Sequence, residues 1–192
     1  MLFRKKFVIL WTICEDMNLL KRLWVHLSRL HHSLGFGIQS PSDYAFVRYV
    51  INEHWPYYAY QQLDAMTKDS MRRKLGKLYF RLANWRQPSQ MLRDDYETFW
   101  LAGCRKTKMV DEVTHIELGR MTLCGNYRQQ MPAIYNKVDS QSVLVIEGIF
   151  RDKDFWREIE RDSRTGVTFD LYYCGIVFFD KKRHKKNYII NF

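Results

Sequence analysis

The first half of the chain places apolar residues at the three- and four-residue spacing of amphipathic helices. This pattern predicts helices over residues 18–33, 44–54, 58–68 and 70–85. The first of these carries the apolar positions Leu19, Leu20, Leu23, Trp24, Leu27 and Leu30. Glycines at 35 and 37 end it, and Ser40-Pro41 opens the next. We therefore expect an N-terminal helical segment over residues 1–88.

After Pro88 the pattern changes to short β-compatible runs separated by turn residues. A helix is predicted at 154–161, a further β-compatible run lies at 113–118, and the last three strands are expected to form a β-meander. The sequence thus predicts one α/β unit, with the helical segment packed on a sheet core over residues 89–192 that has an antiparallel C-terminal edge. Strands are predicted at 89–93, 121–124, 143–147, 167–173, 175–179 and 187–192.

Length and composition fit this single unit, because 192 residues with 46% hydrophobic residues are enough for one core. The apolar run 7–14 behind the basic residues 4–6 resembles an export signal but lacks a cleavage site, so we favour an extra turn of structure or a start at Met17. The run is too short to span a membrane.

Four widely separated cysteines without a CxxC pair favour a reduced, cytoplasmic protein.

Three stretches of the chain form a recognisable series: Gly37-Ile-Gln-Ser-Pro41 followed by Tyr44, then Lys77–Pro88, and finally Met121 to the C-terminus, including Ser142–Ile149 and Val167–Phe179. Together they resemble a bacterial family of small class I methyltransferases that depend on S-adenosylmethionine (SAM), the O-methyltransferase-like type with an added N-terminal helical segment. This resemblance implies a reduced Rossmann-like sheet. It covers about three quarters of the chain, so we interpret the chain as a shortened, degenerate member.

The main departure from the family lies where its cofactor loop belongs. Residues 91–102 contain no glycine, although only glycine allows a backbone to approach the cofactor closely at a helix N-terminus. Tyr96, Phe99 and Trp100 would instead form the apolar face of a short helix, and Asp94, Asp95 and Glu97 suit its first turn better than a metal or ribose site.

The stretch between the cofactor loop and the catalytic edge is also too short. Residues 105–119 cannot hold two strands with their helices. Thr114–Glu117 is interpreted as a remnant of the ribose-binding strand, which makes Glu117 the one candidate ligand for the cofactor.

The resemblance places the family's catalytic acids where this chain has other residues. One aspartate position is Cys124, followed by Gly125 and Asn126, and an acidic pair survives only as Glu147-Gly148. Cys124, Asn126 and Glu147 are therefore the candidate catalytic residues, although a structural thiol is the commoner role for a cysteine such as Cys124. The histidines lack the spacing of a metal site, and we expect no metal.

The function predicted from these features is non-catalytic binding by a methyltransferase-like protein that has lost its cofactor site and holds no cofactor. One alternative is an active SAM-dependent methyltransferase with a rebuilt pocket. A second alternative is a basic nucleic-acid-binding module, since the net charge is +10 and basic loops bind phosphates. The basic loop of this chain contains Lys181, Lys182, Arg183, Lys185 and Lys186.

A truncated sheet edge on the side where the family binds its cofactor would also favour a homodimer or a protein partner.

Overall fold

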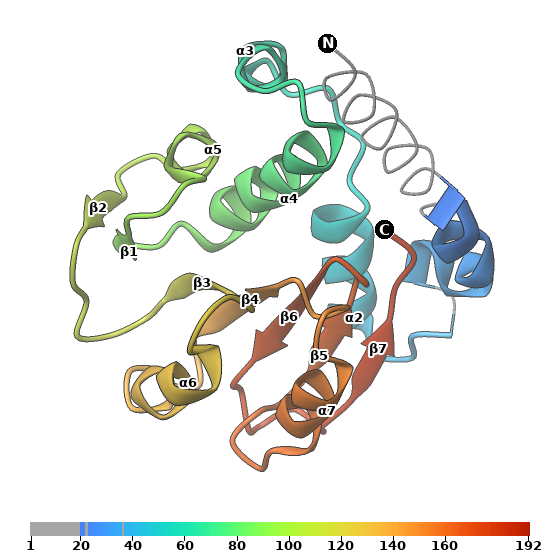
Figure 1. Ribbon diagram of the computed structural model, residues 1–192, viewed down its shortest axis with the longest axis vertical. Helices are drawn as coiled ribbons and strands as arrows, with labels where there is room; N and C mark the ends of the chain where they lie inside the picture. The colour runs from blue at the N-terminus through green and yellow to red at the C-terminus, as the bar shows by residue number, and fades with distance from the viewer. Residues whose placement is uncertain (1–19, 22, 36) are drawn as a thin grey trace, which may run out of the picture.

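The computed structural model describes residues 20, 21, 23–35 and 37–192, and it places one mixed β-sheet between two layers of helices (Figure 1). Residues 20, 21 and 23–28 are helical and lead into a short 3-10 helix, η1. The helices that follow are η1 (Leu30–Gly35), α2 (Pro41–Phe46), the π-helix η2 (Val47–Ile51), α3 (Ala59–Ala65), α4 (Ser70–Arg86), α5 (Glu97–Gly103), α6 (Tyr127–Tyr135) and α7 (Lys153–Arg161).

The main sheet has five strands in the order β3-β4-β6-β5-β7. Strand β6 is antiparallel to both of its neighbours, while β3 pairs with β4, and β5 with β7, in parallel. A separate parallel pair is formed by β1 and β2. The strands are β1 (Gln90–Leu92), β2 (Lys108–Val110), β3 (Leu118–Thr122), β4 (Val143–Glu147), β5 (Thr168–Asp170), β6 (Cys174–Phe178) and β7 (Asn187–Ile189).

Strand β4 shows why the sheet needs helices on both faces. Its residues Val143 and Val145 pack into one apolar cluster together with α2, η2, α4 and α5, whereas Leu144 and Ile146 pack into a second cluster with α6 and α7. Side chains alternate across a strand, so a strand with four consecutive apolar residues must be covered on both sides. The α/β class expected from the sequence is confirmed in this form.

Helix α4 is the longest of the helices in the described part of the chain and supports the side of the sheet where β1 and α5 lie. Asp69 caps its N-terminus by accepting a hydrogen bond from the Met71 amide at 2.8 Å. Gly76 on its buried face leaves room for the Phe99 ring of α5, since a Cβ at Gly76 would collide with that ring. Phe99 and Trp100 are thus the apolar face of a short helix, as the sequence predicts.

The strand predictions need correction between α5 and β4. The strand predicted at 121–124 is β3 at Leu118–Thr122, because its parallel register with β4 begins at Leu118 and the chain turns at Gly125, where φ is +61°. Residues 113–117 are irregular, and Val113 and Ile116 are buried without a ladder, which gives the run its strand-like pattern.

The sequence pattern does not predict two elements, strand β2 and helix α6. Strand β2, at Lys108–Val110, is only three residues long, and Pro132 interrupts the helical pattern of α6. Strand β2 also replaces the expected remnant at Thr114–Glu117, so one short strand does fit between α5 and β3.

The expected C-terminal meander is wrong in its order. Strand β7 does not pair with β6; it crosses over and adds to β5 in parallel, so the antiparallel strand lies inside the sheet and not at its edge. The hydrogen bond from the Asn191 amide to the His32 carbonyl (3.1 Å) ties the last residues to η1. Tertiary packing of the chain ends therefore decides where β7 pairs.

Candidate functional site

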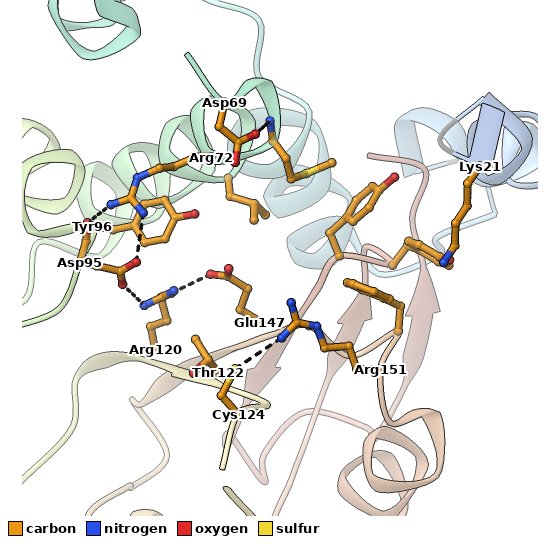
Figure 2. A pocket seen from close by; sticks show the side chains of 16 residues that line it. Lys21, Asp69, Arg72, Asp95, Tyr96, Arg120, Thr122, Cys124, Glu147 and Arg151 are labelled. Atoms are coloured by element: carbon orange, nitrogen blue, oxygen red, sulfur yellow. Dashed lines mark hydrogen bonds and ion pairs between the residues drawn. The ribbon is translucent and has the colours of Figure 1, made fainter. Parts of the chain in front are cut away.

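A cavity of about 470 Å³ opens at the carboxyl ends of the parallel strands β3, β4 and β5 (Figure 2). Because parallel strands end at one edge of a sheet, Thr122 of β3, Glu147 of β4 and Tyr172 after β5 meet there. The volume is in the range of small-molecule sites. The lining residues are Lys21, Asp69, Met71, Arg72, Leu75, Asp95, Tyr96, Arg120, Thr122, Cys124, Glu147, Gly148, Phe150, Arg151, Tyr172 and Tyr173.

One wall of this cavity is organised around Arg120, whose side chain is only 7% exposed. Its Nε donates to Glu147 Oε2 at 2.7 Å, and its Nη1 donates to Asp95 Oδ1 at 2.7 Å and to Asp94 Oδ2 at 3.3 Å. Figure 2 shows the guanidinium between Asp95 and Glu147. Although burial acts against the charged form, the hydrogen bond that Arg120 donates to Glu147, together with the Glu147 charge, raises the pKa of Arg120, so the group stays a cation.

Aromatic side chains enclose this cluster from the α4 and α5 side. The Tyr79 hydroxyl donates to Glu147 Oε2 at 2.7 Å, and the Tyr79 ring stacks on Trp100 with centroids 4.7 Å apart. Trp100 Nε1 donates to Asp94 Oδ1 at 3.1 Å. Burial, together with the nearby Glu147 charge, raises the pKa of Tyr79, so its hydroxyl remains a donor. The carboxylates on this wall therefore already have partners.

The opposite wall carries basic and aromatic groups with no carboxylate attached. Arg151 Nη1 lies 3.4 Å from Cys124 Sγ, and its guanidinium lies 5.7 Å from the centre of the Phe150 ring. Lys21 Nζ lies 5.6 Å from the same ring, which stacks on Tyr172. Neither Arg151 nor Lys21 forms an ion pair with another residue of the described part of the chain, so the described groups of this wall are positively charged.

The backbone around this second wall is unusual at two positions. Gly148 has φ +85° and starts the turn in which the Arg151 amide donates to the Gly148 carbonyl at 2.8 Å. Tyr172 has φ +71°, a left-handed conformation that a bulky residue seldom adopts. Asp170 Oδ1 holds it by accepting from the Tyr172 amide at 2.7 Å. Positive φ at a bulky residue beside a cavity is a common feature of functional sites.

The structure brings together only some of the candidate residues. Cys124 and Glu147 both line the cavity. Asn126 stands before α6 and is not among the lining residues. Glu117 lies before the amino end of β3, at the opposite end from Glu147, where its carboxylate accepts from the Ser89 amide at 3.1 Å and from the Ser89 hydroxyl.

The basic loop is partly built into the fold. Arg183 forms an ion pair with the buried carboxylate of Asp43 and lies over the Phe178 ring. Lys185 Nζ donates to Thr165 Oγ1 at 2.8 Å. The remaining basic residues of the loop, Lys181, Lys182 and Lys186, are exposed.

Sequence reasoning missed the residues that organise this cavity. Arg120 was hidden because β3 begins three residues earlier than predicted, which places Arg120 on the face that packs against α4 and α5. A charged residue on the inward face of a buried strand was the available signal. Arg151 and Tyr172 sit in turns without a motif. Within residues 20, 21, 23–35 and 37–192, no group of three histidine, cysteine or acidic residues is placed to hold a metal.

Comparison with protein-family models, with curated proteins and with solved structures finds no match to this chain. None of the described helices is both long and apolar enough to span a bilayer. The described cysteines Cys104, Cys124 and Cys174 are free thiols.

Proposed function

We propose that this protein is a methyltransferase-like binding protein that no longer holds SAM and takes a small organic anion in the cavity at the carboxyl edge of its sheet. The observation that carries the proposal is the position of Arg120. It closes the space between the ends of β1, β3 and β4 through Asp94, Asp95 and Glu147.

The arrangement of the strands supports the resemblance to a Rossmann-like sheet. Ser89, before β1, bonds Glu117, before β3, while Asp95, after β1, bonds Arg120 within β3. Strand β1 therefore lies beside β3 and runs in the same direction, although the two strands do not pair, and the strands follow one another in space as β2, β1, β3 and β4. If β3 and β4 correspond to the fourth and fifth strands of the family, this order matches 2-1-4-5 of a doubly wound sheet.

In such sheets a nucleotide cofactor occupies the crevice between the first and fourth strands, at their carboxyl ends. Here that crevice lies between β1 and β3 and contains the Arg120 cluster. The Tyr96 ring, 4% exposed, lies 4.6 Å from the Arg120 guanidinium and takes up further space. Binding SAM there would require Arg120 to leave its carboxylates, which favours loss of the cofactor site.

The second wall supports the choice of ligand. Arg151 and Lys21 flank the Phe150 ring and supply positive charge, while Tyr172 and Tyr173 add flat apolar surface. An arginine recognises planar carboxylate or phosphate groups through paired donors. The preferred ligand is therefore a carboxylate or phosphate attached to a flat ring.

Isothermal titration of the full chain with SAM and with S-adenosylhomocysteine tests the loss of the cofactor site. We expect no saturable heat up to millimolar concentration. Saturable binding in the micromolar range would overturn the proposal.

Titration with phenyl phosphate tests the ligand class. We expect saturable binding that Arg151→Gln weakens at least tenfold, with inorganic phosphate binding more weakly because it cannot contact the rings. Arg157→Gln removes the same charge from α7, outside this cavity, and serves as the matched control. Equal loss in both variants would show that only net charge matters and would refute a site at Arg151.

An active methyltransferase with a rebuilt pocket is the second candidate, because Cys124 and Glu147 line one open cavity. Glu147 is already engaged by Arg120 and by Tyr79, so it is a poor base in this arrangement. Micromolar SAM binding in the titration above would favour this candidate.

A further inference from the structure

The first described helix turns its apolar side toward solvent. Leu20, Leu23, Trp24 and Leu27 are 67%, 52%, 70% and 60% exposed, and they recur at intervals of three and four residues. They form one stripe, which we call the Leu/Trp stripe. Among the described residues of this helix, only Val25, on a different side, is buried, at 6% exposed. The helix therefore packs against the rest of the protein through the side that carries Val25, and the Leu/Trp stripe remains exposed to solvent.

Further large apolar residues are exposed near the Leu/Trp stripe. Leu30, in η1, is 51% exposed, and Trp55 and Tyr58, in the segment before α3, are 68% and fully exposed. His26 and Trp55 line a common cavity, so this segment lies beside the first helix. Exposed apolar surface of this kind marks a binding surface on a protein whose other large apolar side chains are mostly buried.

Basic residues outnumber acidic ones near the Leu/Trp stripe. Lys21 belongs to the same helix, and Arg22 lies between Lys21 and Leu23 in the sequence, whereas Arg29 already pairs with Asp170 at 2.9 Å. The preceding sequence holds Arg4-Lys5-Lys6 and the acidic pair Glu15-Asp16, and the whole chain carries +10. A helix with leucines and a tryptophan on one side and basic residues beside them has the composition of helices that lie in the interface of an anionic membrane.

We propose that the Leu/Trp stripe docks this protein on the surface of an anionic lipid bilayer, with the helix parallel to the membrane plane. Positive charge selects this occupant over a second copy of the chain. Two copies that each carry +10 repel one another, whereas an anionic surface attracts them. Tryptophan and tyrosine favour the boundary between headgroups and acyl chains, which suits the exposed Trp24, Trp55 and Tyr58. Lys21 also lines the ligand cavity, but the apolar residues of the Leu/Trp stripe do not.

Sedimentation with lipid vesicles tests this proposal on the full chain. We expect partition onto phosphatidylcholine vesicles containing 30% phosphatidylglycerol to exceed partition onto pure phosphatidylcholine at least tenfold at 0.1 M salt. Raising the salt to 0.5 M should reduce binding several-fold, since screening weakens the attraction of the lipid charge. The variant Leu23→Glu/Trp24→Glu should lose at least nine tenths of the binding.

The matched control is Tyr49→Glu/Leu101→Glu, which adds the same two charges at residues that are 65% and 39% exposed in η2 and α5. This control should keep most of its vesicle binding. Equal losses in both double variants would reduce the effect to net charge and overturn the proposal. A dimer in light scattering that Leu23→Glu/Trp24→Glu abolishes, without vesicle binding by the unmodified chain, would assign the stripe to a second copy instead.

Discussion

Replacing Arg120 with methionine tests whether the cluster at the carboxyl edge is a buried charge network. Methionine keeps most of the length of the side chain but leaves Glu147 and Asp94 without a cation, at 22% and 18% exposed. Removing one partner of a fully buried pair costs about 3–5 kcal/mol. The carboxylates here keep some contact with water, and Asp95 is 55% exposed. We therefore expect a loss of about 2–4 kcal/mol.

Urea denaturation followed by circular dichroism measures this loss. In a thermal scan it corresponds to a decrease in Tm of about 5–15 °C for a domain of this size. The double variant Arg120→Met/Glu147→Gln should lose less than the sum of its single variants by about 1 kcal/mol or more, because the second change removes the carboxylate that the first leaves unpaired.

Arg128 provides the matched control for this experiment. Its guanidinium contacts Asp152 and Glu158, each at 2.9 Å, but its side chain is 48% exposed. Exposed pairs contribute little to stability, so Arg128→Met should have a much smaller effect than Arg120→Met. Equal effects of the two variants, or additive effects in the double variant, would refute the argument that burial makes the Arg120 cluster important.

Two further predictions concern packing and pH. Gly76→Ala should destabilise the protein by about 1–2 kcal/mol in urea denaturation, because the collision with Phe99 exceeds the gain in helix propensity; unchanged or raised stability would contradict the close contact of α4 with α5. The hydrogen bonds and charge of Arg164 lower the pKa of Asp162 to about 2. Because the unfolded carboxyl titrates near about 3.9, the pair stabilises the fold above about pH 4 and loses this effect as the pH falls toward 2. Thermal scans should therefore show Asp162→Asn below the unmodified protein at pH 7, with a difference that shrinks between pH 4 and pH 2; a difference that stays constant over this range would contradict the assignment.

The sequence by itself determined the elements whose pattern is local. The strand predicted at 143–147 from the apolar run 143–146 is β4 at the same bounds, and helix α4 covers the predicted residues 70–85 and one more. The short helix with Phe99 and Trp100 on its apolar face also followed from spacing alone. In each case the buried positions follow one another at the spacing of a helix or a strand, so periodicity is enough to predict the element.

Tertiary structure decided everything that depends on contacts between distant segments. The pairing of β7 with β5 places residues next to one another that are about twenty positions apart, and no local pattern distinguishes this from pairing with β6. Arg120 gains its role only because Asp94-Asp95 and Glu147 arrive from two other parts of the chain. The hydrophobic pattern specifies which residues avoid water, but it does not specify which partners they meet, so the cavity and the uncovered Leu/Trp stripe emerge only when the chain is folded.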